Sequence, residues 1–248
     1  MRKCEIKQVY TLTLTIPTQS CAIVTGASSG IGDQISNLLP CWGVSVIAPN
    51  RDVLDLADKN QITQFIDRIL NDSSCNLQYI YLNAGVHDNQ LNDIINAQAN
   101  IQIVTGLKDM IIKNNIQVIV TSSVMQYSLS DSYGRSKRRA INEISKLIPK
   151  NVRFVTPGIT MSNMMLKNTP FENLHRGYAN LLGFYTPFQS AEYIVLSSFV
   201  KDVNSSMILM PFIYMLPYQL KVPYIHSLLE YISQNIFHGD FLVACPVD

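Results

Sequence analysis

The sequence predicts an α/β protein with a doubly wound parallel sheet of about seven strands and helices on both faces. Two observations support this prediction. Short, continuously apolar runs alternate along the chain with stretches of helical spacing, which is the pattern of strands buried on both faces. The glycines, serines and asparagines that stand out follow the carboxyl ends of these runs, and ligands bind at that edge of such a sheet.

The first half of the chain contributes three expected strands and two helices. The apolar run at 21–24 leads through a glycine-rich turn into a helix at 33–39. A second strand is expected at 44–48 and a short third strand at 52–55, with the helix between them reduced or absent. Apolar residues then recur at helical spacing from Lys59 to Leu70, which predicts a helix there.

The second half continues the alternation. The expected elements are a strand at 79–82, a helix from Ile94 to Ile112, a strand at 118–120, a helix from Tyr133 to Leu147, and strands at 152–155 and 207–210. No linker, repeat or low-complexity tract interrupts them, so a single domain over residues 1–248 is expected.

The composition describes a globular protein without charge-driven partners. Of the 248 residues, 47% are hydrophobic and 15% are charged, and the formal net charge of +1 gives no electrostatic case for nucleic-acid binding. The four histidines are dispersed, so no metal site is expected. The five cysteines are scattered and odd in number, which indicates reduced cytosolic thiols, several of them in the core.

The N-terminus lacks the continuous apolar region of a signal peptide, because threonines alternate with apolar residues over 11–16 as in a half-exposed strand. A membrane-spanning helix needs about 18 apolar residues in a row, and the nearest candidate, Met207 to Leu220, is interrupted by two prolines. We therefore expect a soluble, cytoplasmic protein.

The glycine-rich turn, T-G-A-S-S-G-I-G at 25–32, has the context that a dinucleotide needs. Glycines at 26, 30 and 32 permit a tight turn and a close backbone approach to a pyrophosphate, and the following helix offers N–H groups and a partial positive charge. The spacing G-x-x-x-G-x-G differs from the more common G-x-G-x-x-G, and a purely structural glycine turn is the alternative interpretation.

Six short motifs follow one another in order along the chain. They are T-G-A-S-S-G-I-G at 25–32, D-L-A-D at 55–58, N-A-G at 83–85, T-S-S at 121–123, Y-G-R-S-K at 133–137 and P-G at 157–158. With these motifs the chain resembles the short-chain dehydrogenase/reductase family over residues 20–165. The resemblance implies a Rossmann-like domain that uses NAD(H) or NADP(H) to interconvert alcohols and carbonyls.

Tyr133 and Lys137 are the expected catalytic pair. They lie four residues apart, so on a helix they share one face. A tyrosine hydroxyl with a pKa of about 10 is a poor base at neutral pH, and a neighbouring ammonium lowers that pKa. The resemblance implies that the tyrosine protonates the carbonyl oxygen and that the lysine also binds the nicotinamide ribose. An exposed pair on a surface helix is the alternative.

The resemblance implies two further catalytic positions. Ser123 matches the serine that hydrogen-bonds the substrate carbonyl, but it precedes Tyr133 by only ten residues, so Ser122 remains a rival. Asn96 matches the asparagine that holds a proton-relay water, and Asn100, one turn further along the same face, competes with it. For these serines and asparagines an ordinary structural role is the alternative.

The resemblance also assigns cofactor contacts residue by residue. Those around the phosphates and the adenosine are Gly26, Ser28, Ser29, Gly30, Ile31, Asp55, Leu56, Asn83, Ala84 and Gly85. Those along the nicotinamide are Tyr133, Lys137, Pro157, Gly158, Ile159 and Ser162. Asp55 would accept the adenine amino group. Its alternative role is a helix cap, for which Asp58 is the better candidate.

The choice of cofactor depends on the residues after the second strand. An acidic residue there would bind the ribose 2′-OH of NAD and repel a 2′-phosphate. This chain has Pro49-Asn50-Arg51 instead, and an arginine pairs well with a phosphate. Asp52 follows but is out of register. NADP is therefore the preferred cofactor and NAD is the alternative.

The chain departs from the family's pattern on the substrate side. The loop from Gly85 to Asn96 is short, and residues 160–190, the expected substrate loop, are rich in aromatic residues and leucine, which suggests a lipophilic substrate. Residues 1–19 form an N-terminal extension and 207–248 an atypical C-terminal segment. Within the latter, Met207 to Tyr231 packs on the core or a partner subunit, or forms an apolar surface for a membrane or a lipophilic substrate.

These observations predict an NAD(P)-dependent oxidoreductase acting on a small-molecule carbonyl or alcohol. The resemblance implies a homodimer, and the basic residues Arg135, Arg138 and Arg139 are expected on a solvated helix face. Two other functions remain open. A cofactor-binding regulatory protein of the same fold would fit the short loops and altered C-terminus, and a nucleotide-sugar reductase would fit the missing helix.

Overall fold

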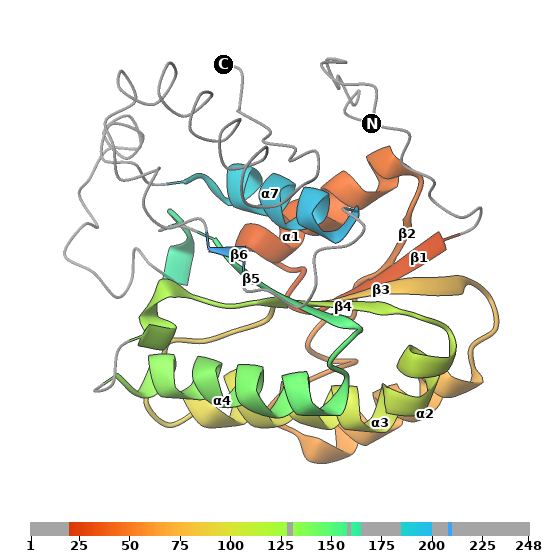
Figure 1. Ribbon diagram of the computed structural model, residues 1–248, viewed down its shortest axis with the longest axis horizontal. Coiled ribbons are helices and arrows are strands. Elements are labelled where there is room, and N and C mark those ends of the chain that lie inside the picture. The colour runs from red at the N-terminus through yellow and green to blue at the C-terminus, as the bar shows by residue number, and fades with distance from the viewer. Residues whose placement is uncertain (1–19, 128–130, 158–159, 165–184, 200–207, 210–248) are drawn as a thin grey trace.

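A parallel sheet forms the centre of the fold and carries helices on both faces (Figure 1). The computed structural model describes residues 20–127, 131–157, 160–164, 185–199 and 208–209. The six described strands run parallel in the order β2-β1-β3-β4-β5-β6. They are β1 (Ser20–Val24), β2 (Ser45–Ile47), β3 (Asn76–Leu82), β4 (Gln117–Thr121), β5 (Val152–Thr156) and β6 (Ile208–Leu209). The doubly wound parallel sheet predicted from the sequence is confirmed.

The helices divide between the two faces of the sheet (Figure 1). One face carries α1 (Gly30–Leu38) and α7 (Pro187–Phe199), which pack on each other. The other carries α2 (Lys59–Asn71), α3 (Asn100–Lys113) and α4 (Ser132–Leu147). Three short turns complete the described elements: the 3₁₀ turns η1 (Leu39–Trp42) and η3 (Val124–Tyr127), and the π-helical turn η2 (Ile94–Ala99) that leads into α3.

The prediction of a short strand at 52–55 is wrong, because the chain forms a turn there. The described sheet therefore has six strands rather than about seven. The N–H of Val53 donates to Oδ1 of Asn50 (3.1 Å), and the N–H of Leu54 donates to the carbonyl oxygen of Asn50 (2.9 Å). These local bonds take up N–H groups that a strand would give to its neighbour, and they close a turn instead. The chain therefore passes from β2 to α2 without a helix between them, as predicted.

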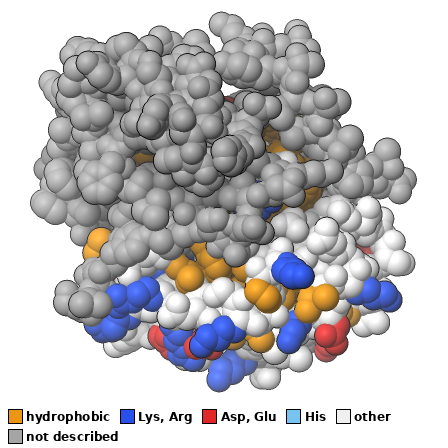
Figure 2. All heavy atoms as spheres, in the orientation of Figure 1, with side chains coloured by type: hydrophobic (Ala, Val, Ile, Leu, Met, Phe, Trp, Pro, Cys, Tyr) orange, Lys and Arg blue, Asp and Glu red, His pale blue; other side chains and the backbone are white. Residues whose placement is uncertain are grey.

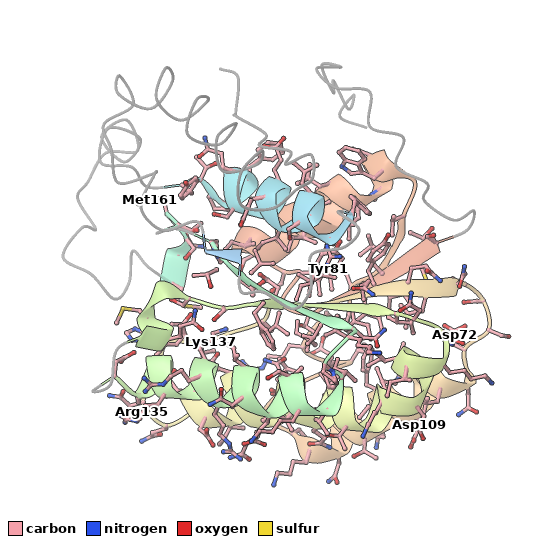
Figure 3. All side chains as sticks on the ribbon, viewed as in Figure 1. Asp72, Tyr81, Asp109, Arg135, Lys137 and Met161 are labelled. Carbon is pink, nitrogen blue, oxygen red and sulfur yellow. A yellow bond between two sulfur atoms is a disulfide. The ribbon has the colours of Figure 1, made fainter. Side chains whose placement is uncertain are left out.

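Two apolar cores separate the sheet from its helix layers. The larger core packs α2, α3 and α4 against one face and contains Phe65, Leu107 and Ile144. The smaller core lies between the sheet and the α1–α7 layer, where Tyr81 is fully buried (Figure 3). The Tyr81 hydroxyl shares a hydrogen bond of 2.6 Å with Oγ of Ser198 on α7. Burial of each large side chain stabilises the fold by roughly 1.5–3 kcal/mol, and the two cores therefore hold the strands in place.

Two aspartates cap the N-termini of helices in the layer that contains α2, α3 and α4. Asp58 accepts hydrogen bonds from the N–H groups of Asn60 (2.8 Å) and Gln61 (3.3 Å) and so caps α2, as predicted. Asp131 accepts from the N–H of Gly134 (2.7 Å) and caps α4. Each cap of this kind contributes about 1 kcal/mol. The second cap places Tyr133 in the first turn of α4.

Cys21 and Cys75 form a disulfide, with Cα atoms 6.1 Å apart. The expectation that the cysteines are reduced thiols is wrong for this pair. The two residues are 54 positions apart in the sequence, and the parallel pairing of β1 with β3 brings them together at the amino edge of the sheet. The expected cytoplasmic location rested in part on reduced cysteines, and this bond removes that part of the argument.

Several predictions concern residues outside the described ranges. They include the strand-like alternation at 11–16, most of the expected substrate loop at 160–190 and most of the segment 207–248. The short strand β6 lies within the strand expected at 207–210. Among the described helices, none combines the length and the apolar character that a membrane crossing requires.

Candidate functional site

The glycine-rich turn lies where the strand order reverses. The chain continues from β1 to β2 on one side of it, and β3 pairs on the other side, so the carboxyl ends of β1 and β3 flank a topological switch point. Gly26 has a φ of 70° there, and a Cβ added to it would lie 2.8 Å from the Cα of Ala84. Only a glycine allows the turn to approach the N-A-G segment this closely.

Thr25 ties these two segments together. Its Oγ1 donates to the carbonyl oxygen of Tyr81 (3.3 Å) and accepts from the N–H groups of Asn83 and Ala84 (both 3.1 Å). The side chain is 1% exposed, so these bonds are shielded from water. The glycine-rich turn and the N-A-G motif, about 58 residues apart in the sequence, therefore form one surface.

The first turn of α1 follows directly and is suited to an anion. Gly30 has a φ of 61°, and the nearest atom to a Cβ added there would be Cβ of Ser162 at 3.9 Å. Ser29 is extended and, within the described part of the chain, makes no side-chain cap. The N–H groups at the start of α1 have no intrahelical partners, so they remain available to a phosphate.

Lys137 is buried between α4 and the sheet, whereas Arg135 on the same helix points away from the sheet (Figure 3). Nζ of Lys137 donates to the carbonyl oxygen of Thr121 at the end of β4 (3.1 Å). Oγ1 of Thr121 in turn donates to Oδ1 of Asn83 (3.1 Å), which links the ends of β3 and β4. Burial lowers the pKa of Lys137 to about 8, because the ammonium has lost most of its hydration.

Tyr133 lies one turn before Lys137 on α4. Nζ of Lys137 is 5.6 Å from the centroid of the Tyr133 ring. Ser123 forms a side-chain hydrogen bond with Tyr133, while Oγ of Ser122 donates to Oε1 of Gln126 (3.1 Å). The structure therefore brings Ser123, Tyr133 and Lys137 together and engages Ser122 elsewhere.

The pKa of Tyr133 is raised above its ordinary value of 10, opposite to the direction expected from Lys137. Burial is the largest cause, since it penalises the phenolate. The hydrogen bond with Ser123 lowers the pKa, and the negative charge of Asp131 raises it. The hydroxyl is consequently a neutral phenol at physiological pH, which is the form that can donate a proton.

Asn96 belongs to the same group and comes from the π-helical turn η2. A Cβ added to Gly85 would lie 3.0 Å from Oδ1 of Asn96 and 3.2 Å from Nζ of Lys137. The Asn96 amide exchanges two hydrogen bonds with the backbone of Val86 (2.9 and 3.0 Å). Nδ2 of Asn100 donates to the carbonyl oxygen of Asn96 (3.1 Å). Asn96 thus borders the site, and Asn100 stands behind it.

Solved structures share this fold at low sequence identity. The 3-alpha-hydroxysteroid dehydrogenase of Pseudomonas sp. B-0831, complexed with NADH, superposes with a TM-score of 0.63 at 17% identity, over 77% of this chain and 95% of that one. The alcohol dehydrogenase of the archaeon Thermococcus sibiricus, complexed with 5-hydroxy-NADP, gives 0.61 at 19% identity, over 80% and 98%. A short chain dehydrogenase of Burkholderia cenocepacia J2315, in complex with NADP, gives 0.60 at 17% identity, over 76% and 94%.

The fold is that of the short-chain dehydrogenases/reductases. The resemblance inferred from the ordered motifs is confirmed at the level of the fold. No protein-family model matches the sequence, and no curated protein matches it.

Within this short-chain dehydrogenase/reductase fold, the residues predicted for the adenosine end contact one another. Nε of Arg51 donates to Oδ2 of Asp55 (3.0 Å), and the N–H of Ala57 donates to Oδ1 of Asp55 (2.9 Å). The bond from Ala57, then that from Arg51, lowers the pKa of Asp55. The Arg51 side chain is 79% exposed, whereas Leu56 is buried in the core. Asp55 therefore holds a local turn, and the helix cap that was its alternative role is made by Asp58.

The remaining predicted cofactor residues divide by exposure. Ser28 and Ser29 are exposed on the glycine-rich turn, and Ile31 is half-buried behind it. Pro157 is buried directly after β5, and Ser162 lies beside Gly30. Gly158 and Ile159 lie outside the described residues.

Two side chains beside Tyr133 were not singled out from the sequence. The ring of His87 meets the ring of Tyr133 edge to face, with centroids 5.2 Å apart and planes at 82°. Nε2 of His87 lies 3.9 Å from Oδ1 of Asp131, and the His87 side chain is 39% exposed. The short loop after N-A-G therefore supplies a polar wall beside Tyr133. Its only sequence signal was the position of His87, two residues after Gly85.

Lys and Arg side chains gather on the outer surface of the α4 layer (Figure 2). Arg139 there pairs with Asp93 (2.6 Å) and Glu143 (2.7 Å), as expected for a solvated helix face. A groove of about 540 Å³ lies in the same layer, with Thr63, Gln102 and Arg139 among its lining residues. Its position on the outer side of α2 and α3 separates it from the candidate site.

Proposed function

We propose that the protein is an NADP(H)-dependent oxidoreductase that interconverts a carbonyl and an alcohol. The observation that carries this proposal is the meeting of Ser123, Tyr133 and Lys137 at the carboxyl edge of the sheet. The three solved neighbours described above are dehydrogenases complexed with a nicotinamide cofactor or a derivative of one, which supports the same chemistry here.

The switch point fits a dinucleotide. The start of α1 has no side-chain cap within the described residues, and at Gly30 an added Cβ would come no closer than 3.9 Å to another group, Cβ of Ser162. Asn83, Ala84 and Gly85 would support the ribose side, and the exposed guanidinium of Arg51 would pair with a 2′-phosphate. That arginine supports NADP over NAD. When bound, the cofactor supplies a hydride.

Tyr133 would act as the acid in carbonyl reduction. Its raised pKa keeps the hydroxyl protonated, so it can give its proton to the substrate oxygen while the carbonyl carbon gains the hydride. Ser123 would donate a hydrogen bond to that same oxygen as negative charge develops. Lys137, whose pKa is about 8, would then return a proton to the Tyr133 phenolate, with Asn96 bordering the path. Alcohol oxidation reverses these steps.

Three further features are proposed on the sequence alone. The aromatic and leucine-rich composition of 160–190 favours a lipophilic small-molecule substrate. A homodimer would pair through α3 and α4, and the whole chain would act as one domain. The two alternative functions keep their own sequence support, and the next experiment separates the non-catalytic one.

Deuterium transfer tests the proposal directly. The protein is incubated with NADPH or NADH carrying deuterium at C4, each face labelled in turn, and with a panel of ketones and aldehydes of graded lipophilicity. We expect deuterium at the carbinol carbon of an alcohol product, with faster transfer from NADPH. Tight cofactor binding without transfer to any carbonyl would overturn the oxidoreductase proposal and favour the cofactor-binding regulatory protein.

A further inference from the structure

Two asparagine–serine hydrogen bonds join α4 to the segment that precedes α3. Nδ2 of Asn92 donates to Oγ of Ser132 (3.0 Å), and Nδ2 of Asn96 donates to Oγ of Ser136 (3.2 Å). The two asparagines are four residues apart, and so are the two serines. The pairs therefore form successive rungs between two neighbouring helical turns. We call these four residues the Asn–Ser ladder.

Each serine of the ladder immediately precedes a residue of the proposed catalytic pair. Ser132 stands before Tyr133, and Ser136 stands before Lys137. The second rung also reaches the tyrosine directly, because Oγ of Ser136 donates to the carbonyl oxygen of Tyr133 (2.7 Å). A displacement of either rung would therefore move the backbone that carries a proposed catalytic side chain.

Three of the four ladder residues are buried, Ser132 is half-buried, and the ladder is internally connected. Asn92, Asn96 and Ser136 are each no more than 2% exposed. Nδ2 of Asn96 also donates to Oδ1 of Asn92 (3.4 Å), which links the two rungs. Oδ1 of Asn92 accepts from the N–H of Asp88 (2.9 Å) and so holds the loop that carries His87. Buried polar groups that satisfy one another fix a single geometry, since each alternative leaves a donor or acceptor unpaired.

The first turn of α4 has special need of such support. Its N–H groups lack intrahelical partners, and helix ends fray readily. Tyr133 occupies the second position of this turn, after the cap at Asp131 and the rung at Ser132. On the opposite side the π-helical turn η2 presents Asn96, and such turns are common at functional sites.

We propose that Asn92 is a positioning residue for the reaction, acting through Ser132 on Tyr133. The second rung, Asn96–Ser136, does the same for Lys137. The inference rests on the proposed function. It adds a division of labour, in which the first rung sets the proton donor and the second sets the lysine expected to bind the cofactor.

Kinetics of Asn92→Ala, Ser132→Ala and the double variant test the first rung. Each single change should lower kcat by about tenfold, since small misplacements of a reacting group cost up to about 100-fold. The loss in the double variant should be smaller than the product of the two single losses, because both changes remove the same bond. Each change also removes one bond of its own, from Ser132 to Oδ1 of Asn89 (2.9 Å) and from the N–H of Asp88 to Oδ1 of Asn92 (2.9 Å). The Kd for NADPH should stay within about twofold of wild type, because the Lys137 rung is intact. Ser132→Thr keeps the hydroxyl and should keep kcat.

Asn142→Ala is the matched control, an asparagine exposed on α4 away from the ladder, and its kcat should be unchanged. The proposal is overturned if Asn92→Ala keeps the wild-type kcat, if the two losses multiply in the double variant, or if NADPH affinity falls as much as kcat. If the wild-type protein transfers no deuterium, the proposed function has failed, and the ladder is then judged by titration.

That titration follows the ultraviolet absorbance of the Tyr133 phenolate, isolated by subtracting the Tyr133→Phe variant. The intact hydrogen bond between Ser123 and Tyr133 lowers the tyrosine pKa. Loss of the first rung should weaken this bond, so the titration midpoint should rise in Asn92→Ala. An unchanged midpoint would overturn the positioning role, with or without a known substrate.

Discussion

Ser122 and Ser123 stand next to each other at the end of β4 and make different bonds. Ser123 hydrogen-bonds with Tyr133, while Ser122 donates to Gln126, whose Nε2 donates to Oγ1 of Thr156 (3.3 Å). Ser122 therefore ties β4 to β5, and Ser123 faces the proposed reacting groups.

Alanine at each serine separates these roles. Ser123→Ala should lower kcat by about 100-fold, the size of effect seen when one oxyanion donor is removed. Ser122→Ala should change kcat by less than about tenfold and should mainly lower the unfolding free energy, by about 1 kcal/mol. Steady-state kinetics and urea unfolding of both variants provide the measurement. If Ser122→Ala lost more kcat than Ser123→Ala, then Ser122 and not Ser123 would be the serine that binds the substrate oxygen.

Asp131 carries a charge that acts on Tyr133. Its carboxylate raises the tyrosine pKa, and alcohol oxidation needs the phenolate, so the oxidation rate should rise with pH through that pKa. Asp131→Asn keeps an acceptor for the N–H of Gly134 and removes the charge. The midpoint of the kcat profile should therefore move to lower pH, because one cause of the raised Tyr133 pKa is removed.

The matched control for this pH shift is Asp109→Asn. Asp109 is an exposed carboxylate on α3, at the other end of the helix layer from Arg135, which lies in the first turn of α4 with Tyr133 (Figure 3). Its removal should leave the midpoint in place. A midpoint that rises in Asp131→Asn would show that the cap, and not the charge, governs Tyr133.

At the scale of residues, the sequence predicted which residues form the proposed catalytic group, but not the direction in which the pKa of Tyr133 is shifted. The spacing of Tyr133 and Lys137 predicted one helix face, and the structure places both there. The direction of the Tyr133 pKa depends on burial and on Asp131, and neither can be judged from spacing. His87 could not be predicted, because an unpaired histidine in a loop carries no pattern.

At the scale of elements, α4 is held against η3 by a close backbone contact. A Cβ added to Gly134 would lie 2.0 Å from the carbonyl oxygen of Met125. Gly134→Ala should lower the unfolding free energy by about 2 kcal/mol, since overpacking a fixed backbone costs about 1–3 kcal/mol. It should also lower kcat, because Tyr133 is the preceding residue. Urea unfolding and kinetics measure the two effects.

Gly106→Ala on α3 is the control for this substitution. The nearest atoms to an added Cβ there are Cδ1 (2.7 Å) and Cγ2 (2.9 Å) of Ile66, which belong to a side chain and not to the backbone. Its cost should be below about 1 kcal/mol, since alanine is also the better helix former by about that amount. Equal costs at the two glycines would contradict the rigid contact between α4 and η3.

Helices and buried strands were predictable because their apolar periodicity survives in the fold. The helix from Lys59 and the one ending at Leu147 follow the predicted bounds closely. The strand expected at 52–55 failed because Asn50 takes up the N–H of Val53 and Leu54 locally. The π-helical form of η2 was not predicted, since one extra residue in a turn leaves the apolar pattern almost unchanged.

At the scale of the whole molecule, the disulfide between Cys21 and Cys75 closes a long loop between β1 and β3. An odd number of cysteines without a spacing motif could not predict this pair, because its partners meet only through strand pairing. Cys75→Ser should lower the unfolding free energy by about 4 kcal/mol if loop-closure entropy governs the effect. Cys75→Ala should agree with it, and unfolding curves of both variants that match wild type would contradict the bond.

The fold as a whole places the glycine-rich turn, the N-A-G segment and the Ser123, Tyr133 and Lys137 side chains at the carboxyl edge of the sheet. The motif order predicted that edge. It did not predict the Asn–Ser ladder, whose partners are 40 residues apart in the sequence and meet only when η2 packs on α4.

The most direct measurement compares wild type with Tyr133→Phe, which removes one hydroxyl oxygen and keeps the ring. The kcat for the best carbonyl of the panel should fall by about 1000-fold, within the range that general acid catalysis supplies. The Kd for NADPH should stay within about twofold of wild type, because the ring and Lys137 remain. A variant that reduces the carbonyl at the wild-type rate would contradict the role of Tyr133 as the proton donor.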